Sequence, residues 1–332
     1  MLEKLVDTFG RKVNYLRLSV TEQCNLNCFY CRSSPVECGV ATQEAYLNVD
    51  EIVSIGEVAV ELGIQRIRLT GGEPLLRPDI LKIVHGLAKI PGIEDLSLTT
   101  NGVLLHKMAF DLAEAGLMRI NISLDSLDEA NFKHITNGGK LSNTLLGIEK
   151  AIQAGLTPVK LNVVLLKGVN DHEIKNFLLM TLNKEIDIRF IEFMPCSQEG
   201  KWTSHFLSQE KVTEIAQNIA PLESVEGEHG GGPARYFRLQ GAMGKIGLIS
   251  PLSQHFCDRC NRLRVTSDGK IKPCLFSNEE IDLAPHLRDK KILKEKFKEA
   301  LNVKPDPGQV AEEPLERGKQ FKSIRSMTQT GG

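Results

Sequence analysis

Three cysteines, Cys24, Cys28 and Cys31, fall within the stretch CNLNCFYC. A structural zinc site closes with four ligands, and no fourth cysteine follows here at the usual metal-binding spacing. An iron–sulfur cubane held by three thiolates instead leaves one iron open to another molecule. The spacing therefore favours a cluster that takes part in chemistry. The alternative is a zinc knuckle that Cys38 or a distant histidine completes.

A second group of three cysteines lies far downstream. The stretch CDRC supplies Cys257 and Cys260, and Cys274 follows after thirteen residues. Alone, this pattern is typical of a zinc ribbon. Two incomplete trios in one chain favour a shared kind of metal chemistry over two unrelated zinc sites. Cys196 and His255 are further candidate ligands for the second trio.

Cationic residues alternate with apolar ones along several strand-like stretches. Arg17, for example, shares a strand face with Tyr15, and Leu16 lies on the opposite face. Because the apolar face must pack on helices, the cations point inward, where a charge is expensive unless an anion binds. Any single cation could instead reach solvent or pair with an acid. Seven together predict a polyanionic ligand: Arg17, Arg66, Arg68, Lys160, Arg189, Arg262 and Arg264.

Six strand-like stretches position these residues, and helical patterns separate the later ones. The predicted strands are 12–20, 65–70, 94–100, 118–125, 158–166 and 186–194, and the predicted helices are 79–90, 106–116, 143–155 and 171–182. Regular βα alternation implies a parallel sheet, and six units are two fewer than a closed barrel has. The first trio directly follows the first strand, where such folds place their active sites.

The rhythm breaks after residue 195, which predicts two regions, 1–240 and 241–332. Residues 196–240 are polar and contain GEHGGGPA, a predicted loop. The second trio lies in the later region, which ends in a polar tail from about residue 303 that finishes with RSMTQTGG. Such an end is normally disordered, although two glycines without side chains can enter a narrow site.

Bulk composition excludes several classes of protein. The formal net charge is -1, so no global basic surface recruits nucleic acid or a membrane. No stretch approaches the roughly 20 apolar residues of a membrane span, and the start MLEKLVDTFGRK lacks the apolar core of a signal peptide. We therefore expect a cytoplasmic protein. Eight cysteines are too few for a disulfide scaffold at this length, and in a reducing compartment grouped cysteines indicate metal or redox chemistry.

Several motifs together resemble a known family. The first trio with Tyr30 resembles the signature of radical S-adenosylmethionine enzymes, and GGEP at 71–74 resembles their methionine-binding motif. More narrowly, the chain is similar over essentially its whole length to the GTP 3',8-cyclases of molybdenum cofactor biosynthesis. The segments that carry this likeness are IRLTGGEPLLR, FIEFMP, ISPLSQHFCDRCNRLRVTSDGKIKPCLF and RSMTQTGG. The resemblance implies an α/β fold, a partial TIM-like barrel of six βα units with a C-terminal cluster-binding extension.

The resemblance also implies site residues and cofactors. Two 4Fe-4S clusters would be held, one by Cys24, Cys28 and Cys31 and the other by Cys257, Cys260 and Cys274. S-adenosylmethionine would contact Tyr30, Gly72, Ser123 and Met194. GTP would contact Arg17, Arg66, Arg68, Thr99, Lys160, Arg189, Arg262 and Arg264. The residues implied in catalysis are Arg17, Arg262, Arg264, Gly331 and Gly332.

The implied reaction is a radical cyclisation. A 5'-deoxyadenosyl radical would take hydrogen from the ribose C3' of GTP, and the sugar radical would add to C8, giving 3',8-cyclo-7,8-dihydro-GTP. The implied partners are an electron donor of flavodoxin or ferredoxin type, a downstream cyclic pyranopterin monophosphate synthase and a second copy of the chain. Residues 32–50 depart from the family pattern, and Gln23 stands where a basic residue is common.

Two other interpretations stay open. The first is a different radical S-adenosylmethionine enzyme whose second cluster serves a peptide, although a peptide needs no polyphosphate site. The second is a non-catalytic zinc protein that binds nucleic acid through its arginine pairs, which the neutral charge disfavours. Iron and sulfide analysis separates the zinc interpretation from the others.

Overall fold

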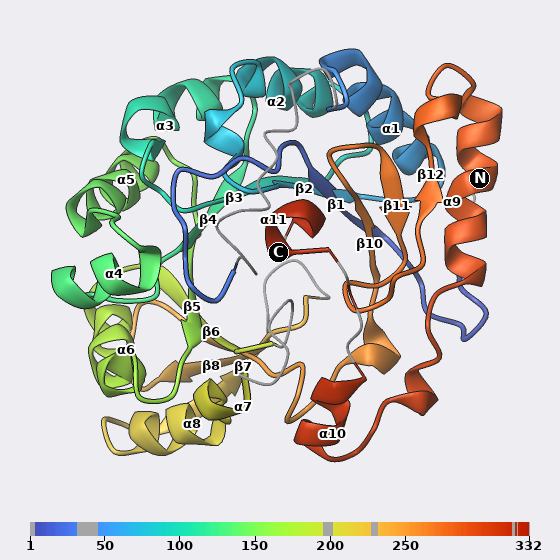
Figure 1. The fold of residues 1–332 in the computed structure, drawn as a ribbon. Helices are drawn as coiled ribbons and strands as arrows, with labels where there is room; N and C mark the ends of the chain where they lie inside the picture. Colours follow the sequence, from blue (N-terminus) through green and yellow to red (C-terminus); the bar gives the residue numbers. More distant parts are fainter. Residues whose placement is uncertain are drawn as a thin grey trace.

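One curved sheet with helices on its outer face forms the protein (Figure 1). The computed structural model describes residues 4–31, 46–194, 202–226, 232–320, 323 and 325–331. All six predicted strands are confirmed, each slightly shorter than its pattern: β1 (Tyr15–Ser19), β2 (Arg66–Thr70), β3 (Asp95–Thr100), β4 (Arg119–Ser123), β5 (Val159–Leu165) and β6 (Ile186–Glu192).

Two further strands extend the parallel part of the sheet. β9 (Ile246–Ile249) pairs in parallel with β6, and β10 (Arg262–Val265) pairs in parallel with β1. Antiparallel strands follow at both edges, β11 (Lys270–Lys272) and β12 (Ile281–Asp282) beyond β10, and β8 (Arg235–Leu239) and β7 (Leu222–Val225) beyond β9. The strand order starts at β12 and ends at β7 without closing, which confirms a partial barrel. The region after residue 240 therefore contributes strands to this same sheet, and a domain boundary there stays a prediction.

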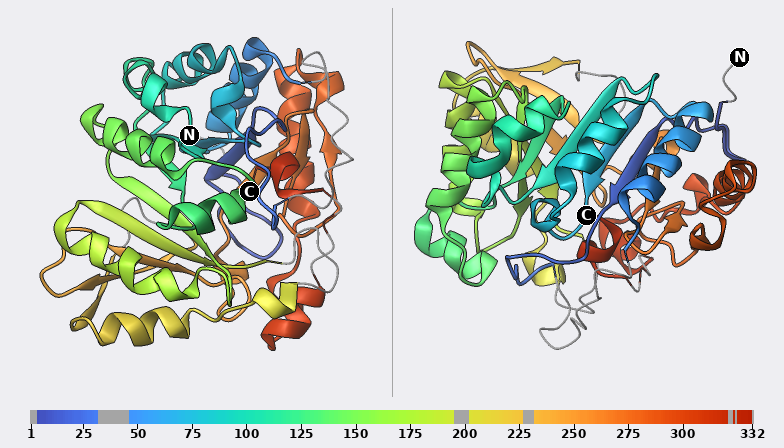
Figure 2. Two further views of the ribbon diagram at one scale, coloured as in Figure 1. Left: turned by 60° about the vertical axis from the view of Figure 1, so that its left-hand side comes forward. Right: turned by 90° about the horizontal axis from the view of Figure 1, so that it is seen from above.

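Helices cover the outer face of the sheet (Figure 2). The predicted ones are confirmed as α2 (Ile80–Ala88), α3 (Leu105–Glu114), α5 (Leu141–Gln153) and α6 (Ile174–Asn183), whereas α1 (Val49–Glu61) and α4 (Glu129–Thr136) were not predicted. α1 begins at a capping box between Asn48 and Glu51 and buries Ile52 and Ile55 against the sheet. The apolar strand face meets these helices, which leaves the opposite, polar face to line the inside.

The polar stretch 196–240 contains more regular structure than its sequence indicates. It holds α7 (Trp202–His205), α8 (Glu210–Gln217), β7 and β8 among its described residues. α8 buries only Val212 and Ala216, and β7 is a partly exposed edge strand, so the apolar pattern that reveals an element is thin here. Residues 227–231 of the predicted loop lie outside the described residues.

The C-terminal region packs on the side of the barrel formed by α1 and the strands after β10. α9 (Lys290–Asn302) packs on α1, where Lys290 Nζ lies 2.7 Å from Glu57 Oε2. α10 (Pro314–Lys319) follows, and α11 (Met327–Thr330) lies inside the curve of the sheet (Figure 1). Short 3-10 helices are η2 (Pro74–Leu76), η3 (Asp171–Glu173), η4 (Cys257–Arg259), η5 (Ala284–His286) and η6 (Pro307–Gln309). Across the described ranges no helix is both long and apolar enough to cross a membrane.

Candidate active site

Both cysteine trios face a single cavity of about 310 Å³ inside the barrel. The trios come from distant parts of the sequence, and the parallel pairing of β1 with β10 brings the two regions side by side. The six thiols of the trios are free of disulfides. His255 lines the same cavity, whereas Cys38 and Cys196 lie outside the described residues.

The backbone after β2 packs directly on the backbone that leads into the first trio. Gly72 N donates to Thr21 O at 2.8 Å, and Glu73 N donates to Gln23 O at 2.7 Å. A Cβ added to Gly72 would lie 2.2 Å from Gln23 O, so no side chain fits there. The GGEP glycines therefore set the position of the residues just before Cys24.

Glu73 ties this turn to the end of β3. Its buried carboxylate accepts from Leu75 N at 3.0 Å, the Thr100 hydroxyl at 2.7 Å and Asn101 N at 2.7 Å. Burial raises the pKa of Glu73 to about 7. Asn101 in turn places its side-chain Nδ2 3.8 Å from Cys24 Sγ. Glu73 therefore helps to position Asn101 beside the first trio.

Tyr30 and Asp125 form a buried pair on the cavity wall. The Tyr30 hydroxyl donates to Asp125 Oδ2 at 2.5 Å, and Val164 N donates to Asp125 Oδ1 at 2.8 Å. Burial raises the pKa of Asp125 to about 6. Burial, with Asp125 beside it, also raises the pKa of Tyr30 well above its usual value. Tyr30 thus stays a neutral hydrogen-bond donor with a fixed ring.

Basic side chains surround the second trio. Lys304 Nζ donates to Arg262 O at 2.9 Å and to Pro273 O at 2.8 Å, and it lies 3.8 Å from Cys260 Sγ. Burial raises the pKa of Cys260, but the charges of Arg262 and Lys304 outweigh it and lower the pKa to about 6. The thiolate that binds metal is therefore favoured at this position.

The two thiol trios have the ligand chemistry of iron–sulfur clusters. Each thiolate of a 4Fe-4S cluster binds its own iron, so three thiolates leave the fourth iron open. With three thiols and the cavity beside each set, both trios fit a cluster that keeps one iron accessible.

The inward orientation of the cations is confirmed for five arginines, which line the cavity: Arg17, Arg68, Arg189, Arg262 and Arg264. Their charges perturb one another, because burial and the nearby Arg264 lower the pKa of Arg17 well below its usual value. Among the described residues of the cavity wall, two are carboxylates, Asp125 and Glu192, so the arginines outnumber them there. Such an imbalance in a buried space favours a bound anion.

Two of the predicted cations do not line the cavity. Lys160 is buried beside Asp187, with Nζ 3.3 Å from Oδ2, and lies over the Tyr236 ring. Arg66 is half-buried at the start of β2, two residues before Arg68 on the same strand. The remaining predicted ligand contacts do line it: Tyr30, Gly72, Thr99, Ser123 and Met194.

The C-terminal end of the chain reaches the arginines. Gly331 O accepts from Arg17 Nε at 3.1 Å, from Arg17 Nη2 at 2.8 Å and from Arg264 Nη1 at 2.9 Å. Met327 and Thr328 of α11 line the cavity. The tail thus reaches the site, as the resemblance implied for Gly331, through the contacts of its backbone with Arg17 and Arg264. Gly332 lies outside the described residues.

Sequence reasoning missed several residues of this site. Asp125 and Asn101 each stand at or just after the carboxyl end of a predicted strand, so the rule that placed the first trio there could have found both. Lys304 carries no local signal, since its role arises from contacts with distant segments.

Comparisons with known proteins agree with this site. Residues 18–180 match the model of the Radical SAM superfamily, and residues 186–310 match the model described as Molybdenum Cofactor Synthesis C. A GTP 3',8-cyclase of Listeria monocytogenes is 47% identical over 336 aligned positions, which cover 100% of both chains. A GTP 3',8-cyclase of Alkaliphilus oremlandii is 44% identical over 328 positions, covering 98% of this chain and 99% of the relative.

Solved structures share the fold at low identity. SuiB of Streptococcus suis superposes with a TM-score of 0.63 and 14% identity, covering 90% of this chain and 68% of that one. AdoMet-bound anSMEcpe gives a TM-score of 0.55 with 15% identity, covering 86% and 82%. On the full-length similarity to its curated relatives, together with the superfamily match, this chain belongs to the GTP 3',8-cyclase family of the radical S-adenosylmethionine superfamily.

Proposed function

We propose that this protein cyclises GTP to 3',8-cyclo-7,8-dihydro-GTP, an early step of molybdenum cofactor biosynthesis, with S-adenosylmethionine as the source of the radical. One observation carries the proposal: two thiol trios and five arginines, four of them buried and Arg262 half-buried, face the same cavity. The full-length similarity to proteins named GTP 3',8-cyclase supports it.

Each trio is proposed to hold one 4Fe-4S cluster, the first on Cys24, Cys28 and Cys31 and the second on Cys257, Cys260 and Cys274. The first cluster, when bound, supplies the electron that cleaves S-adenosylmethionine to methionine and a 5'-deoxyadenosyl radical. The protein holds the first set of thiols through the GGEP turn and the second through Lys304. S-adenosylmethionine would contact Tyr30, Gly72, Ser123 and Met194, and Asp125 would keep the Tyr30 ring in one orientation.

The arginines are proposed to bind the triphosphate and so to orient the nucleotide. Arg17 and Arg264 are neighbours in the register of β1 and β10, and Arg68 is the neighbour of Arg17 on β2. Guanidinium groups suit phosphate oxygens because their donors form a planar fork. With the phosphates bound by the arginines, the ribose and base would face the thiol trios in the same cavity. Thr99, Arg189 and Arg262, which also line the cavity, complete the proposed nucleotide contacts.

The C-terminal end would exclude water and complete the site. Gly331 contacts Arg17 and Arg264 through its carbonyl, and Met327 and Thr328 of α11 line the cavity. A radical reaction needs this protection, since stray hydrogen donors would quench the reactive species. We infer the same role for Gly332, the next residue.

Further partners follow from the proposed reaction. It consumes electrons, for which we propose a flavodoxin or ferredoxin, and its product passes to a cyclic pyranopterin monophosphate synthase. We also propose a homodimer and a cytoplasmic location, where reducing conditions keep the grouped thiols available.

The test is isotope transfer in the anaerobically reconstituted enzyme. GTP carrying deuterium at C3' is incubated with S-adenosylmethionine and dithionite. The products are then separated by chromatography, and their masses are measured by mass spectrometry. We expect the cyclised nucleotide together with deuterium in 5'-deoxyadenosine. Formation of 5'-deoxyadenosine without deuterium, and with GTP unchanged, would refute the proposed substrate.

A further inference from the structure

We propose that Arg325 is a positioning residue for the C-terminal tail, defined here as residues 325–331, and that it fixes the tail in the cavity by bridging three separate segments of the barrel. The proposal rests on the proposed function for its effect on activity. Its effect on the docking of the tail is independent of that function.

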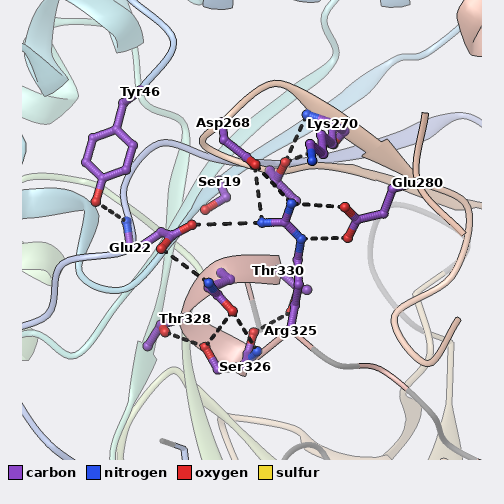
Figure 3. A network of polar contacts seen from close by, with 12 residues as sticks. Ser19, Glu22, Tyr46, Asp268, Lys270, Glu280, Arg325, Ser326, Thr328 and Thr330 are labelled. Carbon is purple, nitrogen blue, oxygen red and sulfur yellow. Dashed lines mark hydrogen bonds and ion pairs between the residues drawn. The ribbon is translucent and has the colours of Figure 1, made fainter. Parts of the chain in front are cut away.

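The contacts of Arg325 are dense for a residue near a chain end. Figure 3 shows its guanidinium between Asp268, Glu280 and Glu22. Nη2 lies 2.9 Å from Asp268 Oδ2, and Nε lies 2.6 Å from Glu280 Oε1, while Nη1 lies 4.0 Å from Glu22 Oε1. Arg325 donates two hydrogen bonds to Asp268 and two to Glu280. The side chain is 16% exposed, so solvent screens this network little.

The three acids belong to parts of the barrel that hold the thiols. Glu22 lies two residues before Cys24, Asp268 lies in the turn between β10 and β11, and Glu280 lies six residues after Cys274. Lys272 Nζ also contacts Glu280, at 3.0 Å. Arg325 therefore links the segment of the first trio to the segment of the second and attaches the tail to both.

Between Arg325 and the cavity the tail has little stability of its own. α11 has four residues and starts at a capping box of Ser326 with Gln329, and a helix of one turn does not persist alone in water. Gln329 Nε2 donates to Glu22 Oε2 at 3.4 Å, a long bond. Without Arg325, the tail would still be held by that bond, by Arg264 Nη1, which donates to Thr330 O at 3.1 Å, and by the contacts of Gly331 O with Arg17 and Arg264.

The chemistry of the network predicts which substitutions matter. Burial raises the pKa of Glu280, but the hydrogen bonds of Arg325 and Lys272 outweigh it, so its pKa lies below the usual value and the acid stays ionised. A guanidinium has enough donors in one plane to form two hydrogen bonds with each of two carboxylates. A lysine ammonium keeps the charge but not this geometry, so it can substitute for Arg325 only in part. We expect Arg325→Gln to lower the rate of product formation by about tenfold to a hundredfold, and Arg325→Lys by less.

The experiment compares tail docking with activity in the reconstituted full chain. Amide hydrogen exchange, read by mass spectrometry over residues 325–331, reports docking. Lys319→Gln is the matched control, because Lys319 is an exposed cation of the same C-terminal region whose partner Glu316 is exposed as well. In Arg325→Gln we expect faster exchange of the tail and a lower rate, with iron and sulfide contents unchanged. The control should match the wild type in all these readouts.

A second arm tests whether Arg325 acts through the tail. In a chain that lacks Gly331 and Gly332, Arg325→Gln should lower activity no further, because the contact that it positions is already lost. Wild-type exchange of the tail in Arg325→Gln, or a fully additive loss of activity in the truncated chain, would overturn the proposal. Loss of iron in Arg325→Gln would overturn it too, since Arg325 would then support cluster assembly. If the wild type forms no cyclised nucleotide, the proposed function fails, and the exchange data still decide whether Arg325 docks the tail.

Discussion

Replacing Gly331 by alanine should remove the tail from the cavity, because the structure leaves no room for one methyl group. Gly331 has φ +67, and a Cβ there would lie 2.0 Å from Thr70 Oγ1 and 3.0 Å from Thr70 Cβ. An L-residue pays about 1 kcal/mol for the left-handed conformation, and relief of the clash requires a shift of roughly 1 Å. That shift breaks the bonds of Gly331 O with Arg17 and Arg264, each worth about 1.5–3 kcal/mol as a charged hydrogen bond.

Together these terms destabilise the docked tail by about 4 kcal/mol or more, which lowers its population relative to the free tail by roughly a thousandfold. The assay is the rate of formation of the cyclised nucleotide, measured with iron content and tail hydrogen exchange. We expect a rate loss of similar size with both clusters retained.

Thr70→Ala tests whether the contact with Thr70 is what excludes a side chain at position 331. Thr70 Oγ1 is buried and has no hydrogen-bond partner among the described residues, so Thr70→Ala removes the clashing atom at low cost. The double variant Thr70→Ala with Gly331→Ala should recover a large part of the lost rate, leaving the backbone strain of about 1 kcal/mol. A wild-type rate for Gly331→Ala, or a double variant no faster than Gly331→Ala, would show that this contact does not control the tail.

Three other predictions concern the thiols and Glu73. Cys24→Ala should abolish formation of 5'-deoxyadenosine, and a wild-type rate of that product would remove Cys24 from the first trio. Cys274→Ala should keep the spectrum of the first cluster and lose the cyclised nucleotide, so normal product would make the second trio structural only. Burial raises the pKa of Glu73 from 4.5 to about 7, so the native state binds this proton more tightly than the unfolded chain. The free energy of unfolding should therefore fall by about 3 kcal/mol as pH rises from 4.5 to about 7. In Glu73→Gln this fall should be smaller. Denaturant unfolding of both proteins at each pH measures the difference. Equal pH dependence in the two proteins would contradict this.

Local patterns in the sequence determined the first six strands, four of the helices and the two thiol trios. Alternation of Arg17 with Leu16 and Leu18 is visible within five residues, and a strand presents such residues to opposite faces whatever its neighbours are. The turn chemistry of GGEP is likewise local. For that reason the inward cations and the position of the first trio were predictable.

Only the tertiary structure decided which of these groups meet. The pairing of Arg17 with Arg264 in the β1–β10 register joins residues far apart in the chain, and no local periodicity encodes that register. Lys160 on β5 lies beside Asp187 on β6 in the strand register and forms an ion pair with it. This contact between neighbouring strands explains why Lys160, a predicted cation of the site, does not line the cavity. The tail is the clearest case: RSMTQTGG has no apolar pattern, and only the folded barrel brings carboxylates of three separate segments to Arg325. Such contacts form once the strands are in place, since the free energy of each depends on burial that the folded barrel alone supplies.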